Sequence, residues 1–178
     1  MNIDNLVENF FLDARNQAGL DFFSLVTWLG EWKLVVFLII LTLAIFWLKG
    51  KKEYILAFLV TVLGAEISGQ LAKIIFHRAR PDGGLETENT FSFPSGHALI
   101  AAAFYGFLIY FFWCVSKSRA QKYFFLIVGL VLILLIGVSR LYLDMHYFSD
   151  VIGGYILGAI WLVIGIYVQQ KKSKTGAV

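Results

Sequence analysis

Apolar residues run along this chain in blocks that are long enough to cross a membrane. Four blocks fall at about 33–48, 54–76, 95–115 and 122–139, and a fifth falls at about 150–168. Roughly 20 apolar residues in a helix are enough to cross the hydrocarbon core of a bilayer. The pattern therefore predicts an all-α fold, a polytopic bundle of about five transmembrane helices.

The first 32 residues follow a different pattern. From residue 3 to residue 14, apolar side chains share one helical face, and the polar side chains Asp4, Glu8, Asn9 and Asp13 fall elsewhere. This spacing predicts an amphipathic helix that lies in the membrane interface. A sixth span across 8–28 would place several charged and amide side chains in hydrocarbon, at a high cost in free energy. Five spans are therefore favoured over six, with residues 1–32 as an interfacial N-terminal segment.

Composition supports a membrane protein. Hydrophobic residues make up 59% of the chain, charged residues make up 15%, and the mean hydropathy is +0.75. A soluble domain of this size is far less apolar, so the bilayer is the expected solvent. The one cysteine, Cys114, excludes an internal disulfide framework and a cysteine-rich metal site. No basic region precedes an apolar run at the N-terminus, so a cleaved signal peptide is not expected. No repeat or linker divides residues 1–178, and we expect one domain.

Basic residues predict the orientation of the bundle. They gather in the connection at 49–52, in the connection at 117–122 and in the tail at 171–174. Five alternating spans place all three groups on one side, which should be the cytoplasmic side because short cytoplasmic connections are rich in Lys and Arg. The opposite ends of the spans should face the extracytoplasmic side.

Three polar clusters interrupt the apolar pattern at that opposite side. They read Lys73-x6-Arg80-Pro81, then Pro94-Ser95-Gly96-His97, then Ser139-Arg140-x5-His146-x3-Asp150. Together they supply three cations, two histidines and a carboxylate. Such a set can bind a phosphate, attack it and protonate its leaving group. The 41 residues between the second and third clusters are enough for a hairpin of two spans, which returns the chain to the same surface.

This constellation, in this order, resembles the type 2 phosphatidate phosphatase superfamily, which includes lipid phosphate phosphatases, bacterial acid phosphatases and vanadium haloperoxidases. The resemblance covers residues 73–150, and all three motifs match. It implies that His146 is a nucleophile that forms a phosphohistidine. Asp150 would orient His146 through its other ring nitrogen, and His97 would protonate the departing oxygen.

The same resemblance implies a phosphate-binding group. Lys73, Arg80 and Arg140 would neutralise the equatorial oxygens of the reacting phosphate. Ser95 and the backbone N–H of Gly96 would bind it where a span begins, because a helix N-terminus offers free donors to an anion. These cations already supply the electrostatic work of a metal, so neither a metal nor another cofactor is expected.

Other polar residues have more than one interpretation. Glu66 and Gln70 form a stripe with Lys73 and His77 on the span at 54–76, which makes them possible supporting residues of the site. Glu66 can equally form a hydrogen bond between packed helices. His77 reads as an interfacial residue and Asp144 as a solvated loop carboxylate. The repeat Gly154-x3-Gly158 predicts close helix packing.

The segment from Asp82 to Phe93 reads as the longest loop. Its acidic, glycine-containing first half leads to Phe91 and Phe93, which could contact a lipid tail as part of a lid. The alternative is a passive connector.

These observations predict an integral protein of the cytoplasmic (inner) membrane with an active site on the extracytoplasmic side. The expected activity is hydrolysis of a phosphate monoester or diphosphate on a membrane lipid, with undecaprenyl diphosphate or phosphatidylglycerol phosphate as first candidates. Phosphatidate and lipid A 1-phosphate are alternatives. A vanadium haloperoxidase and a non-catalytic lipid-binding or transport protein are remote alternatives. The bilayer and the lipid substrate are the expected partners, nucleic acid is not, and the pattern does not indicate an oligomeric state.

Overall fold

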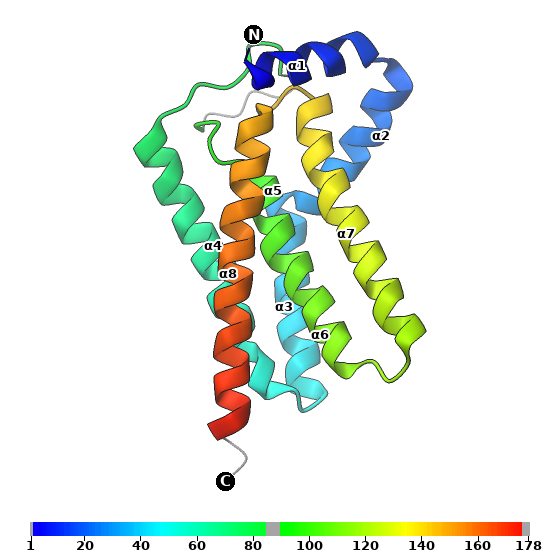
Figure 1. Ribbon diagram of the computed structural model, residues 1–178, viewed down its shortest axis with the longest axis vertical. Coiled ribbons are helices and arrows are strands. Elements are labelled where there is room, and N and C mark those ends of the chain that lie inside the picture. Colours follow the sequence, from blue (N-terminus) through cyan, green and yellow to red (C-terminus); the bar gives the residue numbers. More distant parts are fainter. Residues whose placement is uncertain (1, 85–89, 176–178) are drawn as a thin grey trace.

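The computed structural model describes residues 2–84 and 90–175, and within these ranges the predicted all-helical fold is confirmed (Figure 1). The elements in chain order are α1 (Ile3–Ala14), α2 (Gln17–Thr27), the 3₁₀ turn η1 (Trp28–Gly30), α3 (Trp32–Leu48), the 3₁₀ turn η2 (Lys52–Tyr54), α4 (Ile55–Phe76), α5 (Gly96–Ile100), the π-helical turn η3 (Ala101–Tyr105), α6 (Gly106–Val115), α7 (Arg119–Tyr142) and α8 (Phe148–Thr175).

Among the described residues, four helices are long and apolar enough to cross a membrane, and they match four of the predicted blocks. They are Lys52–Phe76, Gly96–Val115, Arg119–Tyr142 and Phe148–Lys172. The block at 33–48 corresponds to α3, which has 17 residues. It forms a fifth candidate span together with Gln17–Gly30, across a bend of 44°. The fifth span therefore includes part of the segment that was expected to stay in the interface.

The N-terminal 32 residues form two helices that run in different directions. Figure 1 shows α1 lying across one end of the bundle and α2 running down beside α7. Asn16 starts α2 as an N-cap, because its side-chain oxygen accepts a hydrogen bond from the Gly19 N–H at 2.9 Å. The Asn16 N–H donates to the Tyr142 hydroxyl at 3.0 Å, which fixes the turn against α7. Only α1 matches the predicted interfacial helix.

Close packing of α8 on α5 brings two of the polar clusters together. A Cβ on Gly154 would lie 2.6 Å from the backbone oxygen of Ser95, and a Cβ on Gly158 would collide with the backbone oxygen of Leu99. These two glycines therefore allow the α8 backbone to approach the start of the helix at Gly96–Val115. The predicted packing role of Gly154-x3-Gly158 is confirmed.

The other end of the bundle has an aromatic core. Phe46 lies 4.7 Å from Phe111 and 5.7 Å from Phe58 between ring centroids, and all three rings are buried. Both basic connections, between α3 and α4 and between α6 and α7, lie at this end, opposite α1 (Figure 1). The basic residues of the two connections thus lie at one end of the molecule and the three polar clusters at the other.

Candidate active site

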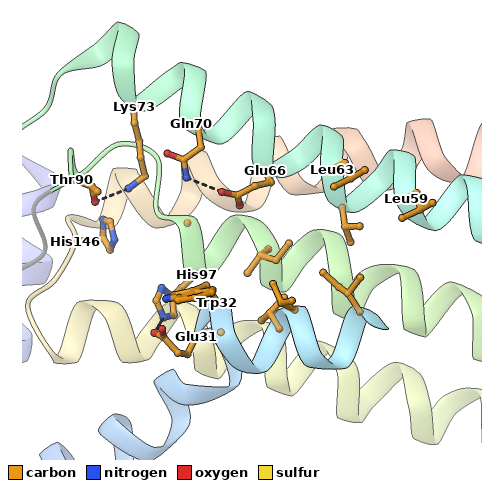
Figure 2. Close-up of a pocket in the computed structure, with 17 residues that line it drawn as sticks. Glu31, Trp32, Leu59, Leu63, Glu66, Gln70, Lys73, Thr90, His97 and His146 are labelled. Atoms are coloured by element: carbon orange, nitrogen blue, oxygen red, sulfur yellow. Dashed lines mark hydrogen bonds and ion pairs between the residues drawn. The ribbon is translucent and has the colours of Figure 1, made fainter. Parts of the chain in front are cut away.

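The three polar clusters meet at a cavity of about 730 Å³ between α3, α4 and the start of α5. Figure 2 shows Lys73, Thr90 and His146 at its polar end and His97 on the opposite wall. Leu59 and Leu63 line its far end, together with Val35, Val36, Ile39 and Val62. The cavity therefore connects two histidines and a cation with a strongly apolar region.

His146 lies between a cation and a carboxylate. Its side chain is 1% exposed, and its Nε2 lies 3.2 Å from the Nη1 of Arg80. A guanidinium group can only donate, so this contact assigns the lone pair to Nε2 and the proton of the neutral ring to Nδ1. His146 Nδ1 lies 3.6 Å from Asp150 Oδ2. The arrangement leaves a lone pair on Nε2, as the predicted nucleophile requires.

Asp150 is fully buried and receives several hydrogen bonds. Its Oδ2 accepts from the hydroxyl of Ser92 and from the backbone N–H of Tyr147, the latter at 2.9 Å. Its Oδ1 accepts from Arg78 Nη1 at 2.6 Å. The Ser92 Oγ also lies 3.4 Å from His146 Nδ1, so the hydroxyl lies beside both members of the pair. These contacts fix the Asp150 carboxylate beside the His146 ring.

The environment of His146 favours its neutral form. Burial lowers the pKa of His146 to about 4, and the nearby cations Arg140 and Arg80 act in the same direction. The contact with Asp150 acts in the opposite direction without overcoming them. At neutral pH, His146 therefore carries the lone pair that a nucleophile needs.

Two of the predicted phosphate-binding cations converge on Thr90. The Nζ of Lys73 donates to the Phe91 carbonyl at 2.8 Å and lies 3.4 Å from the Thr90 hydroxyl. Arg80 donates to the Thr90 carbonyl at 2.8 Å and to its hydroxyl at 3.0 Å. Arg140 is buried, does not line the cavity, and donates to the hydroxyl of Thr27 at 2.9 Å. The structure thus brings Arg80 into contact with His146 and Lys73 to the same cavity as His146, whereas neither Arg80 nor Arg140 lines that cavity.

The start of the helix at Gly96 is open. A Cβ at Gly96 would meet nothing within 4 Å, and Gly96 lines the cavity. Ser95 precedes it as the N-cap residue, and its hydroxyl is buried without a hydrogen-bond partner among the described residues. The predicted binding of an anion at these backbone donors stays a prediction.

His97 lies on the opposite wall, beside residues that the motifs do not include. Its Nε2 lies 3.9 Å from the carboxylate of Glu31, at the junction of η1 and α3. A Cβ on Gly30 would lie 2.7 Å from His97 Cδ2, so the glycine allows the imidazole to pack closely against η1. The N-terminal part of the chain therefore builds one wall of the site.

Glu66 and Gln70 line the cavity between its polar and apolar ends. Gln70 Nε2 donates to Glu66 Oε1 at 2.7 Å, and both residues are exposed. This hydrogen bond lies within α4 and does not join two helices. The position is compatible with a supporting role for both residues, which stays a prediction.

Phe91 and Phe93 lie outside the cavity lining. The Phe91 ring packs on His77 with ring centroids 4.5 Å apart, and the Phe93 ring packs on Phe76 at 4.8 Å. The predicted contact of these rings with a lipid tail has no support from their position. Of the three acids of the predicted lid, Asp82 is exposed, and Glu86 and Glu88 fall outside the described residues.

Two sequence interpretations differ from the structure. Asp144 was expected to be a solvated loop carboxylate, but it is 4% exposed and packs against Gly83. Asp4 was expected on the polar face of an interfacial helix, but it is also 4% exposed. Both carboxylates lie at the end of the bundle that α1 covers, which periodicity within a single helix cannot reveal.

The motifs also missed several residues that contact the catalytic groups. Arg78 and Ser92 bind Asp150, Thr90 binds Arg80, and Glu31 lies beside His97. Arg78 lies inside Lys73-x6-Arg80, so a second arginine near that motif was a visible signal. Ser92, Thr90 and Glu31 carry no comparable signal, because their roles depend on how distant segments meet.

The fold and the site together define a polytopic integral membrane protein with a histidine and cation site that opens into an apolar cavity. The family model of the PAP2 superfamily matches residues 54–174, and the chain belongs to this superfamily. This match contains all three polar clusters.

Two relatives that are similar in sequence to this chain carry the names of phosphatases. The chain is 36% identical over 106 residues to phosphatidylglycerophosphatase B of Bacillus subtilis, covering 57% of this chain and 52% of the relative. It is 28% identical over 111 residues to undecaprenyl-diphosphatase of Sulfolobus acidocaldarius, covering 61% and 49%. The chain thus spans about half the length of these curated relatives.

Two solved structures share the fold. One is the crystal structure of a transmembrane PAP2 type phosphatidylglycerolphosphate phosphatase from Bacillus subtilis, with a TM-score of 0.88, 28% identity and coverage of 94% of this chain and 85% of the other. The other is Aquifex aeolicus LpxE, with a TM-score of 0.75, 21% identity and coverage of 94% and 96%. The second likeness concerns the fold alone.

Proposed function

We propose that this protein hydrolyses a phosphate ester or diphosphate of a membrane lipid through a covalent phosphohistidine at His146. The cavity is the observation that carries the proposal. Its polar end holds His146, His97 and Lys73, and its apolar end lies between α3 and α4. A lipid phosphate has the same division into a charged head and an apolar tail. The motifs and the family membership support the same class of reaction.

The first step transfers the phosphoryl group to the protein. Phosphate oxygens replace His146 as the partner of Arg80, and Lys73 neutralises a further oxygen. The Nε2 lone pair attacks phosphorus while the bond from phosphorus to the lipid oxygen breaks. His97 donates a proton to that oxygen, and Asp150 stabilises the positive charge that develops on His146.

The second step releases phosphate. Water attacks the phosphohistidine, the bond between phosphorus and Nε2 breaks, and His97 accepts a proton from the water. The imidazole of His146 returns to its neutral state, and His97 is protonated again. Atoms and protons balance without an added cofactor.

Phosphatidylglycerol phosphate is the first substrate candidate. The names of the Bacillus subtilis relative and of the Bacillus subtilis crystal structure support it, and the Sulfolobus relative keeps undecaprenyl diphosphate as the second. Phosphatidate and lipid A 1-phosphate remain alternatives.

A lipid panel tests the proposal. Purified protein in vesicles is incubated with each of the four lipids in the presence of EDTA, and released phosphate is measured. We expect release from at least one lipid, complete inhibition by excess vanadate, and no release by His146→Ala. Release that requires an added divalent cation, or turnover by His146→Ala, would contradict the mechanism. Halide oxidation with bound vanadium, in place of hydrolysis, would favour a haloperoxidase.

The proposed location is the cytoplasmic membrane, with the active site on the extracytoplasmic side. The basic residues of the two connections and of the C-terminal part of α8 lie at the end opposite the site, which supports this orientation. In a Cys114→Ser background, Asp13→Cys should react with an impermeant thiol reagent in intact cells, and Ser118→Cys should not. Both positions are exposed on the protein. The reversed labelling pattern would place the reaction on the cytoplasmic leaflet.

A further inference from the structure

A buried carboxylate at the start of the chain contacts the catalytic network. Asp4 belongs to α1, and it is 4% exposed although it lies in the first turn of a surface helix. Its Oδ1 accepts from the backbone N–H of Ser149 at 2.8 Å, and its Oδ2 accepts from the Ser149 hydroxyl at 2.7 Å. Asp4 therefore binds the first turn of α8, one residue before Asp150.

Arg78 connects Asp4 with Asp150. Its Nη2 donates to Asp4 Oδ2 at 2.7 Å, and its Nη1 donates to Asp150 Oδ1 at 2.6 Å. The guanidinium also lies 4.2 Å from the centroid of the Tyr147 ring. One planar group thus joins α1, the loop after α4 and α8, with both ends of its fork used.

The charges of this connection are stable at neutral pH. Burial alone would raise the pKa of Asp4, but hydrogen bonds from Arg78 and Ser149 outweigh it and hold the pKa below its ordinary value. Burial would lower the pKa of Arg78, and its contacts with Asp4 and Asp150 raise it. Each group remains ionised because the other does.

We propose that Asp4 and Arg78 are positioning residues for the reaction, and that α1 is the part of the fold that holds Asp150, and through it His146, in the reactive geometry. The inference rests on the proposed function, in which His146 is the nucleophile. It assigns a catalytic purpose to a helix outside the residues matched by the family model.

The arrangement has an electrostatic consequence that a purely structural contact would not have. Arg78 offsets the charge of Asp150, and Asp150 faces the ring of His146. Arg140 and Arg80 also act on the charge of His146, and Lys73 and His97 line the same cavity as His146. A second, small pocket that His146 also lines contains Asp4, Glu8, Asp144 and Tyr147. Without the charge of Arg78, Asp150 should attract a proton on His146 more strongly, which would raise the pKa of His146.

Five purified variants test the inference: Arg78→Gln, Arg78→Lys, Asp4→Asn, the double variant Asp4→Asn/Arg78→Gln and, as a matched control, Asp13→Asn on the same helix as Asp4. Asp13 is exposed. Phosphate release is measured from pH 3.5 to 8 with the lipid that the panel identifies, and thermal unfolding checks that each variant is folded.

We expect Arg78→Gln to lower kcat about 100-fold and to move the acidic limb of kcat/KM upward by at least about half a pH unit. Arg78→Lys keeps the charge but cannot join both carboxylates, so kcat should fall about 10-fold with the limb unmoved. Asp4→Asn should lower kcat about 5-fold without raising the limb, and the double variant Asp4→Asn/Arg78→Gln should lose no more than Arg78→Gln alone. Asp13→Asn should behave as the wild type.

Wild-type kcat in folded Asp4→Asn, or a folded Arg78→Gln that loses activity with an unmoved acidic limb, would overturn the inference. If Arg78→Gln does not fold, Arg78→Lys and Asp4→Asn decide the question through kcat. Failure of the proposed function has a different signature, because His146→Ala would then retain turnover.

Discussion

The two histidines of the site are held in very different ways. His146 lies in a loop with its side chain 1% exposed, and it contacts Arg80, Ser92 and Asp150. The His97 side chain is 15% exposed, and its Nε2 lies 3.9 Å from a carboxylate oxygen of Glu31. Polar contacts hold His146 in place. His97 is held by close packing against Gly30 and has only the more distant carboxylate of Glu31 beside it.

This difference matches the two roles that we propose. A nucleophile gains most from a fixed direction, because phosphorus must meet its lone pair in line with the leaving oxygen. A general acid has to reach the oxygen of a leaving group that remains attached to a lipid tail, so its wall of the cavity can be less constrained. The His146 side should therefore be the more sensitive to substitution.

Asp150→Asn should have the largest effect among the conservative changes. The amide would present a donor to the Nδ1–H of His146, or force the proton onto the nucleophilic nitrogen. We expect kcat to fall by about 10³- to 10⁴-fold, as when the orienting carboxylate of a catalytic triad is replaced. Asp21→Asn, which changes a carboxylate on α2 away from the cavity lining, is the matched control. Near-normal turnover by Asp150→Asn would remove the orienting role.

His97→Gln should have a smaller effect that depends on the leaving group. A lipid alkoxide needs a proton as it departs, so kcat for a lipid phosphate should fall about 10²- to 10³-fold. A nitrophenyl phosphate releases a stable anion and should lose less than about 10-fold. Glu31→Gln should lower kcat several-fold, and more for the lipid phosphate than for nitrophenyl phosphate. Equal losses on both substrates would contradict general acid catalysis by His97.

Leu63→Trp should affect binding of the lipid tail. Leu63 lines the apolar end of the cavity, whereas Leu71 lies on the same helix, is exposed to a similar extent and does not line it. We expect Leu63→Trp to raise KM for a long-chain lipid about 10-fold and to leave nitrophenyl phosphate unaffected. Leu71→Trp should leave both unchanged. If both variants behave alike, the tail binds elsewhere.

The acidic limb of the pH profile is the smallest expected effect, because it does not change the rate at neutral pH. His146 reacts in its neutral form, and its pKa lies at about 4, so kcat/KM should rise as pH increases through about 4 and fall again at the higher pH at which His97, the general acid, loses its proton. A rate profile in vesicles from pH 3 to 8 measures this limb. An acidic limb near pH 6.5, the ordinary value for histidine, would show that the ring is more exposed to solvent than the structure indicates.

The sequence predicts the spans well because hydropathy reports burial in lipid directly. The four long helices fall at the predicted blocks, and the glycine repeat in α8 is a packing feature as expected. The N-terminal segment was harder. Its polar residues argued against a span, yet α2 with η1 joins α3 across a bend of 44°. Hydropathy identified the block at 33–48 but did not show that the helix before the bend belongs to the same candidate span.

The sequence also predicted one part of the site and missed another. His146, Asp150, Lys73 and Arg80 share sequence motifs, and the structure brings them together. Asp4 and Glu31 lie outside every motif, and their contacts join residues 74 and 66 positions apart. No local pattern predicts such contacts, because they depend on where the N-terminal helices meet the ends of α4, α5 and α8.

The central claim is that a lipid phosphate transfers its phosphoryl group to His146. It is tested most directly by mixing wild-type protein with phosphate-labelled lipid, quenching with base and locating the label by peptide mapping. We predict label on the peptide that contains His146, in a linkage stable to base and labile to acid, and none in His146→Ala. Label on another residue, or turnover of the lipid by His146→Ala, would contradict the claim.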